Sequence, residues 1–231
     1  MSEVVAIVPL RDGHSGKTRL AASFTPEQRA RLISGMANHV IETLLAVPEI
    51  AQVIVVTRDA DFARTSLSAD PRVRIVAQPD DVVGLNAAIA LGVASAPDGA
   101  SALVMHADLP MVGTDDIREL IGRESALAIA PDRHRTGTNA LFLRGDAFGR
   151  GFGFQFGEGS YHRHRAEALR CGLPCETVIQ MGTETDLDTI GDWDSLPRVV
   201  RISLEAGAGL TNERGSSRLL RDDRPSLTVA G

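Results

Sequence analysis

Short apolar segments that alternate with helical patterns are the feature of this sequence that most restricts its fold. Apolar runs predict buried strands at Val4–Leu10 and at residues 53–57, 73–76 and 102–106. Helical patterns lie between these runs, and strands separated by helices favour a parallel sheet with helices on both faces. We therefore expect an α/β fold with a doubly wound, mostly parallel sheet.

The helix after the first strand has a well-marked start. Thr25 suits the N-cap position, Pro26 suits the first helical position, and Gln28 completes a capping box with Thr25. These residues predict a helix that ends near Leu45. Thr114 is predicted to cap a later helix, whose first turn carries acidic residues that interact favourably with the helix dipole.

The second half of the chain is less regular. Residues 126–130 and 140–143 predict two strands, and a helix is expected to begin near Ser160. A last strand is expected around residues 177–179. The chain becomes rich in Arg, Gly and Ser after Leu196.

Length, charge and composition limit the organisation and the class of partner. The 231-residue chain is long enough for one large domain, which we expect to span residues 1–200, followed by a flexible C-terminal extension at 201–231. The net charge of −6 disfavours a nucleic-acid partner. No segment approaches the ~20 apolar residues of a membrane span, and the start of the chain lacks the basic region of a signal peptide. We expect a cytoplasmic protein in which Cys171 and Cys175 are reduced thiols.

The loop after the first strand carries basic residues where open α/β sheets bind ligands. Gly16, Lys17 and Thr18 resemble the end of a P-loop, but that motif requires glycine at the position of Arg11. The glycine fingerprint of dinucleotide-binding oxidoreductases is also missing from the sequence, which disfavours that class. Lys17 and Arg19 are candidates for contacts with a triphosphate, and a solvated basic loop is the alternative.

Three aspartates are candidates for a metal site. Asp108 follows a predicted strand directly, so we expect it at the C-terminal edge of the sheet. Asp186 and Asp188 alternate with Leu187, which in extended backbone puts both carboxylates on one side. Carboxylate oxygens suit Mg²⁺ that is shared with phosphate oxygens. The alternatives are a turn aspartate at Asp108 and a helix cap at 186–188.

Several polar loops are candidates for binding an anion. Residues 130–143 place hydroxyls and a glycine between two apolar runs, where the loop has little freedom left to lose. Gly157 and Gly159 precede Ser160, so backbone N–H groups at that helix start are expected to approach a phosphate. The residues that follow form a candidate cationic rim: His162, Arg163, His164 and Arg165.

Asn86 is a further candidate, because it lies near the start of the helix that is predicted to open at Gly84. Its amide is expected either to read the edge of a base or to cap the helix. The sequence alone leaves both roles open.

The exact sequences of two segments are more informative than the chemistry that their residue types suggest. Residues 130–143 read APDRHRTGTNALFL and residues 156–160 read FGEGS. They resemble the guanylyltransferases of the deazaflavin-coenzyme pathway, the CofC/FbiD family. The resemblance extends from Val5 to about Trp193, with further matching segments at residues 17–21, 84–88, 107–110 and 187–189.

The resemblance implies a Rossmann-like fold of the nucleotide-diphospho-sugar transferase type. It also implies transfer of GMP from GTP to a three-carbon phosphorylated acid in coenzyme F420 biosynthesis, with release of pyrophosphate and with Mg²⁺ as cofactor. Members of the family use 2-phospho-L-lactate, phosphoenolpyruvate or 3-phosphoglycerate. The next enzyme of the pathway and a second copy of the chain are open candidates for protein partners.

The resemblance also implies roles for individual residues. Those expected to contact the nucleotide are Leu10, Lys17, Gly84, Asn86 and Asp108. Those expected to bind the acid are Thr138, Asn139, Gly157 and Ser160. Those expected to hold the metal are Asp108, Asp186 and Asp188. Those expected to take part in catalysis are Lys17, Arg19 and Asp108.

Two features depart from the family pattern and two rival functions stay open. Residues 12–15 form an insert in the first loop, and His106 stands where a small residue or proline is expected. The rivals are a nucleotidyltransferase that uses CTP with a pterin or a sugar phosphate, and a catalytically inactive nucleotide-binding module.

The implied reaction needs no side-chain base, because a phosphate monoester is mostly dianionic at neutral pH. This agrees with a sequence that shows no evident acid–base pair.

Overall fold

The computed structural model describes residues 3–11 and 17–208. Its strands are β1 (Val4–Leu10), β2 (Ile50–Thr57), β3 (Val73–Ala77), β4 (Ser101–Met105), β5 (Leu127–Pro131), β6 (Thr138–Leu143) and β7 (Cys175–Thr177). Its α-helices are α1 (Pro26–Leu45), α2 (Ala60–Ser66), α3 (Leu85–Ala94), α4 (Thr114–Ile121), α5 (Ser160–Arg170), α6 (Met181–Glu184), α7 (Ile190–Ser195) and α8 (Arg198–Ala208). Two short 3₁₀ helices are η1 (Thr18–Leu20) and η2 (Gly145–Arg150).

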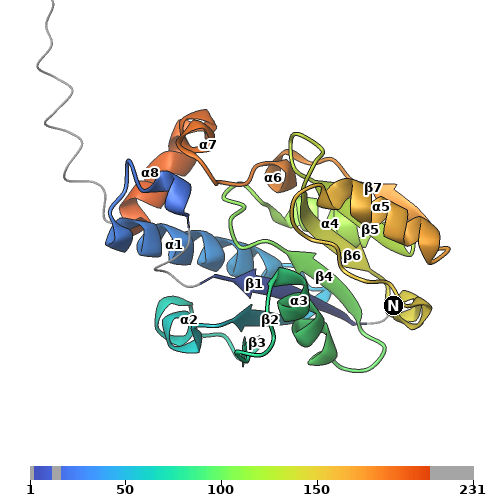
Figure 1. The fold of residues 1–231 in the computed structure, drawn as a ribbon. Coiled ribbons are helices and arrows are strands. Elements are labelled where there is room, and N and C mark those ends of the chain that lie inside the picture. The colour runs from blue at the N-terminus through green and yellow to red at the C-terminus, as the bar shows by residue number, and fades with distance from the viewer. Residues whose placement is uncertain (1–2, 12–16, 209–231) are drawn as a thin grey trace, which may run out of the picture.

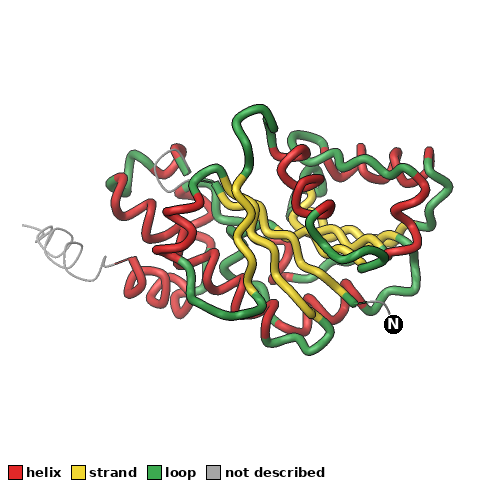
Figure 2. Tube along the Cα trace, turned by 90° about the horizontal axis from the view of Figure 1, so that it is seen from below, coloured by secondary structure: helices red, strands yellow, loops and turns green. Residues whose placement is uncertain are grey.

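The strands of the described residues form one sheet in the order β3-β2-β1-β4-β6-β5-β7 (Figures 1 and 2). β6 runs antiparallel to both of its neighbours, β4 and β5, and the other pairs are parallel. Only a short loop joins β5 to β6, and a parallel pair would need a long crossover connection. The sheet is therefore mixed but mostly parallel, and the expected α/β class is confirmed.

The position of β1 decides where ligands can bind. β1 lies between β2 and β4. The chain leaves β1 toward β2 on one side, and after β3 it returns to β4 on the other side. This reversal is a topological switch point, and in open α/β sheets the crevice beyond it, at the carboxyl ends of the strands, is the usual ligand site.

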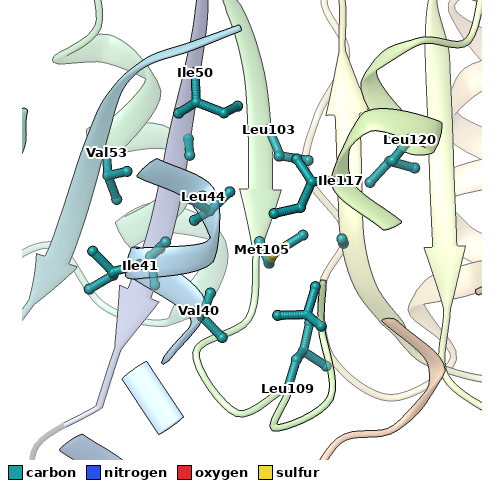
Figure 3. Close-up of a cluster of buried hydrophobic side chains, with 14 of the residues drawn as sticks. Val40, Ile41, Leu44, Ile50, Val53, Leu103, Met105, Leu109, Ile117 and Leu120 are labelled. Atoms are coloured by element: carbon teal, nitrogen blue, oxygen red, sulfur yellow. The ribbon is translucent and has the colours of Figure 1, made fainter. Parts of the chain in front are cut away.

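Helices cover both faces of the sheet because its strands are apolar on both sides. Ala6 and Val8 pack with α1, α2 and α4 in one core, and Figure 3 shows part of this cluster. Val5 and Ile7 point the other way and pack with α3 and α5 in a second core. Successive residues of one strand thus enter opposite cores, as the two-residue period of a strand requires.

The helix starts and strand ends confirm most of the predicted pattern. Thr25 caps α1, and Gln28 closes the capping box. The prediction that Thr114 caps α4 is wrong by one residue. Gly113 is the N-cap, and the Asp116 carboxylate accepts its N–H, so a side chain in the first turn satisfies the backbone without a capping hydroxyl.

Every predicted strand after the first differs in its bounds from the observed one, and β2, β6 and β7 differ by two or three residues. β2 begins at Ile50, three residues before the predicted start. Ala51 and Gln52 interrupt the apolar run, but Ile50 and Gln52 still pair with β1, with a register shift between them. The last strand is Cys175–Thr177 rather than 177–179, since β7 is an edge strand whose three residues pair with β5.

The C-terminal part of the described chain returns to the start of α1. Leu187, Trp193 and Leu196 are buried against Leu20 and Phe24 in a third apolar cluster. Helix α8 packs beside α1 (Figure 1) and runs across the boundary expected at residue 200. The rest of the predicted extension, from residue 209, lies outside the described residues.

No helix within residues 3–11 and 17–208 is long and apolar enough to cross a membrane.

A close approach between α3 and the sheet yields a first prediction. A Cβ atom on Gly92 would lie 2.6 Å from Ile7 Cγ2 and 2.8 Å from Val56 Cγ2, and β-branched side chains cannot move aside easily. We expect Gly92→Ala to lower the free energy of unfolding by about 1–3 kcal/mol in urea titrations.

Gly35 in α1 is the matched control, because a Cβ there meets nothing within 4 Å. Gly35→Ala is expected to raise the free energy of unfolding by about 0.5–1 kcal/mol through helix propensity. Equal stability of the two variants would contradict the packing described for α3.

Candidate active site

A cavity of about 820 Å³ opens at the carboxyl ends of β1 and β4. It lies beside the switch point, and its size falls within the range of small-molecule sites. All the residues to which the resemblance assigns a role line it except Asn86, whereas the four residues of the candidate cationic rim do not. Lining residues for which the sequence gave no signal include Arg58 and Gln78.

Lys17 joins the aspartates of two distant segments. Its ammonium donates hydrogen bonds to Asp108 Oδ2 and to Asp188 Oδ1, the second over 2.6 Å. Lys17 has a left-handed backbone with φ of 54°, an uncommon conformation for a residue with a side chain, directly before η1. Asp108 and Asp188 therefore meet at one edge of the sheet, as the D-x-D pattern and the strand end predicted.

The charges of this cluster change the pKa of each member. Burial alone would lower the pKa of Lys17, but the charges of Asp108 and Asp188 outweigh it and raise the pKa above its ordinary value. Burial opposes ionisation of Asp108, yet Lys17 and His106 hold the pKa of that carboxyl below its ordinary value. Burial and the two neighbouring carboxylates raise the pKa of Asp186 to about 6. The site thus holds more negative charge than Lys17 balances.

Backbone contacts fix the D-x-D segment next to β4. The Leu187 N–H donates to the Asp108 carbonyl over 3.1 Å, and the Leu187 side chain is buried in the third cluster. Asp192 Oδ2 accepts the N–H groups of Asp188 and Thr189 at 3.1 and 2.7 Å. The cap of α7 is therefore Thr189 with Asp192, and Asp188 is left to face the cavity.

Arg133 and Asn139 hold the same segment from the side of β5 and β6. The Arg133 guanidinium donates to the other carboxylate oxygen of Asp192. Asn139 is buried and donates to the Thr183 carbonyl over 2.9 Å and to Asp186 Oδ1 over 3.5 Å. The hairpin thus positions both aspartates of the D-x-D pattern.

The opposite end of the cavity is built from the β5–β6 loop and the start of α5. Asp132 accepts the N–H groups of Thr136 and Gly137, both over 2.9 Å, which shapes the turn before Thr138. Gly157 has a φ of 117°, a conformation that glycine adopts without strain. Thr138, Gly157 and Ser160 all line the cavity there.

Two backbone N–H groups at the start of α5 are engaged within the protein, so the expected approach of this helix start to a phosphate stays a prediction. The Ser160 N–H donates to the Gly157 carbonyl over 3.0 Å, and the Tyr161 N–H donates to the Thr136 carbonyl over 3.1 Å. The loop folds back on the helix start and uses these two donors. Ser160 itself is buried at the cavity wall.

His164 does not belong to a cationic rim, contrary to the prediction. Its ring is fully buried, and its nitrogens contact Thr138 Oγ1 and the Gln155 N–H, each over 2.9 Å. Burial, with the charges of Arg163 and His106, lowers the pKa of His164 to about 3. His162, Arg163 and Arg165 are exposed.

The side chain of Asn86 does not cap α3, which rules out one of the two roles that the sequence left open for it. Its amide nitrogen donates to the Phe156 carbonyl over 3.0 Å, and its amide oxygen accepts the Phe156 N–H over 2.7 Å. Gly84 is the N-cap of α3. Asn86 therefore anchors the loop that carries Gly157, and a direct nucleotide contact stays a prediction.

His106 follows β4 and lines the cavity beside Asp108. Its ring lies 5.4 Å from the Phe156 ring, between centroids, and Nε2 is buried without a hydrogen-bond partner among the described residues. Burial lowers the pKa of His106. The imidazole thus forms part of the cavity wall between the aspartates and the loop at Phe156.

The sheet order, the switch point and the acidic cluster define the class of protein: an α/β protein with the fold of the nucleotide-diphospho-sugar transferases. A solved structure from Desulfovibrio desulfuricans G20, named for that class, superposes with a TM-score of 0.72 at 18% identity, over 91% of this chain and 97% of that one. Rv0371c from Mycobacterium tuberculosis H37Rv, solved in complex with manganese, superposes with a TM-score of 0.53 at 15% identity, over 84% and 100% of the two chains. These likenesses show the fold.

The sequence comparisons show the family. The family described as "Guanylyl transferase CofC like" matches residues 4–195. A phosphoenolpyruvate guanylyltransferase of Sphaerobacter thermophilus is 36% identical over 83% of this chain and 91% of its own. A 3-phospho-D-glycerate guanylyltransferase of Phenylobacterium zucineum is 33% identical over 79% and 84%. The chain belongs to the CofC family of guanylyltransferases.

The buried His164 predicts how stability changes with pH. A histidine whose pKa is depressed in the folded state contributes stability that is complete above its unfolded pKa of ~6.5 and is lost as the pH falls toward the folded pKa of about 3. We expect the free energy of unfolding to fall by up to about 1.4 kcal/mol per pH unit from this group below pH ~6. Urea titrations of the wild type and of His164→Asn measure the slope, and equal slopes would show that His164 is not responsible.

The contacts of Asp192 predict that the cap of α7 contributes to the stability of the protein. Asp192→Ala removes the acceptor for two backbone N–H groups and for Arg133, so we expect the free energy of unfolding to fall by about 1–3 kcal/mol. Asp194→Ala on the exposed side of α7 is the matched control, with an expected change within about 0.5 kcal/mol. Similar losses in both variants would refute the role assigned to Asp192.

Proposed function

We propose that the protein transfers GMP from GTP to the phosphate of a three-carbon phosphorylated acid, phosphoenolpyruvate or 3-phosphoglycerate, in coenzyme F420 biosynthesis. Pyrophosphate is the second product. The family supports guanylyl transfer, and the names of the relatives support these two acids. The observation that carries the proposal is the meeting of Lys17, Asp108 and Asp188 at the switch point of the sheet.

The two ends of the cavity fit two substrates. Leu10 ends β1 and Gly84 is the N-cap of α3, and both line the cavity where there is room for the nucleoside of GTP. Thr138, Gly157 and Ser160 lie at the other end, where they suit a small acid. The acidic cluster separates the two ends, so the reacting phosphates meet at Lys17 and the aspartates.

The aspartates fit a divalent cation, for which we propose Mg²⁺. Asp108 Oδ1 is buried without a hydrogen-bond partner among the described residues, and burial together with the neighbouring carboxylates raises the pKa of Asp186. Within the described part of the chain, no three His, Cys, Asp or Glu side chains form a ready-made metal cluster, because Lys17 lies between the carboxylates. Asp108 and Asp188, with Asp186 beside them, would hold the ion, which would neutralise charge on the triphosphate.

The residues of the chain then act by positioning and by charge neutralisation. The phosphate of the acid attacks the α-phosphorus of GTP, the bond to the β-phosphate breaks, and pyrophosphate leaves. The attacking oxygen is already ionised near pH 7, so no side chain has to remove a proton. Lys17 and Arg19 face the cavity as cations that stabilise the charge of the transferring group.

Asp108→Asn tests the role of the acidic cluster. The amide keeps the shape of the carboxylate but loses its charge, so we expect kcat for pyrophosphate release to fall by at least about 10²–10³-fold while the far-UV spectrum is unchanged. Asp115→Asn is the control, because Asp115 is an exposed aspartate on α4 away from the cavity. Retained activity in Asp108→Asn would refute the site.

A substrate panel tests the reaction. The wild-type protein is incubated with Mg²⁺, with GTP or CTP, and with phosphoenolpyruvate, 3-phosphoglycerate or 2-phospho-L-lactate, and pyrophosphate is measured. We expect release with GTP and one of the first two acids. Release only with CTP and a sugar phosphate or pterin would support the rival nucleotidyltransferase, and no release with any pair would support an inactive nucleotide-binding module.

A further inference from the structure

His164 joins the aromatic core of the α5 region to the wall of the cavity. The ring is fully buried, it stacks on Phe152 with 6.1 Å between centroids, and it meets Phe156 edge-to-face at 4.6 Å. Its only polar neighbours within the described residues are Thr138 and Gln155. The ring itself does not line the cavity, but Thr138 does.

The contact with Gln155 decides where the proton of the imidazole lies. A backbone N–H can only donate, so His164 Nε2, 2.9 Å from the Gln155 nitrogen, must be an unprotonated acceptor. A neutral imidazole carries one proton, which therefore lies on Nδ1. Nδ1 is 2.9 Å from Thr138 Oγ1, so the Nδ1–H donates to the threonine oxygen.

The threonine hydroxyl must then direct its own hydrogen elsewhere. Thr138 is buried and lines the cavity, and no acceptor among the described residues takes that hydrogen. We propose that His164 is a positioning residue that fixes the Thr138 hydroxyl as a hydrogen-bond donor toward an anionic oxygen of the acid substrate. That this oxygen belongs to the acid substrate rests on the proposed function. The direction of the hydrogen bond from His164 to Thr138 does not rest on it.

The physical benefit is an oriented donor in a site that must bind an anion. A hydroxyl that is free to rotate presents lone pairs as readily as its hydrogen, and turning it toward the anion adds to the reorganisation on binding. With its oxygen already accepting from His164, Thr138 meets the anion without that step. The low pKa of His164, about 3, keeps the arrangement constant at neutral pH.

The proton position is tested directly by NMR of the full chain labelled with ¹⁵N-histidine. The His164 signals are assigned by their loss in His164→Asn. We expect a neutral ring with the hydrogen on Nδ1, unchanged between pH 5.5 and 8. A hydrogen on Nε2, or protonation within this range, would overturn the proposal whatever the activity of the enzyme.

The hydrogen-bond direction is tested by two variants of equal size. His164→Asn can still offer an amide N–H to Thr138, whereas His164→Asp offers only acceptors and forces the hydroxyl to turn away from the cavity. Both lose the contact with Gln155, so thermal melting checks that they fold alike. We expect the KM for the acid to be about 10- to 100-fold higher in His164→Asp than in His164→Asn, with the KM for GTP equal in both.

The same two His164 substitutions in a Thr138→Val background separate the effect of the hydrogen-bond direction from the effect of the negative charge of the new carboxylate. If the effect runs through the hydroxyl, the difference in KM for the acid between Asp and Asn disappears when the hydroxyl is absent. If the difference in KM for the acid persists without the hydroxyl, it reflects repulsion by the new carboxylate, and the proposal is overturned. Equal KM values for the Asp and Asn variants in both backgrounds would also overturn it. If no acid supports pyrophosphate release, the proposed function fails, and the NMR result alone decides the position of the proton.

Discussion

The structure depends on one electrostatic constraint: a lysine and several carboxylates must be brought together at the edge of a sheet whose interior is mostly apolar. The switch point between β1 and β4 achieves this, because the loops leaving the two strands lie next to each other. Lys17 comes from the first loop and Asp108 from the second. Asp188 arrives from a segment 80 residues later, held to the Asp108 carbonyl through Leu187.

The surroundings of this cluster explain why the acidic residues are stable there. Asp192 and Arg133 fix the backbone of the D-x-D segment, and Asn139 holds Asp186 from β6. The antiparallel β5–β6 hairpin thus supplies both the support for the aspartates and, through Thr138, the wall of the acid end. A mixed sheet is therefore tied to the site: the strand that breaks the parallel pattern carries Thr138 and Asn139, which line the cavity.

Local sequence signals predicted the fold well and the site in part. The apolar runs and the Thr25 capping box were sufficient to predict the parallel half of the sheet. Asp186 and Asp188 both line the cavity, because in extended backbone every second side chain points to the same side. The roles of His164 and Asn86 could not be predicted, since their partners, Thr138 and Phe156, lie 26 and 70 residues away and no local pattern encodes such contacts. The internal bond of the Ser160 N–H was also missed, because it depends on how the loop at Gly157 folds back onto the helix start.

The most direct test of the central claim is the binding of Mn²⁺ in the presence of GTP, followed by electron paramagnetic resonance of the free ion. The wild type, Asp108→Asn and Asp188→Asn are compared at equal protein concentration. If residues from β4 and from the D-x-D segment form one cation site, each substitution weakens binding of the same ion strongly. Equal affinity in all three proteins would contradict the account.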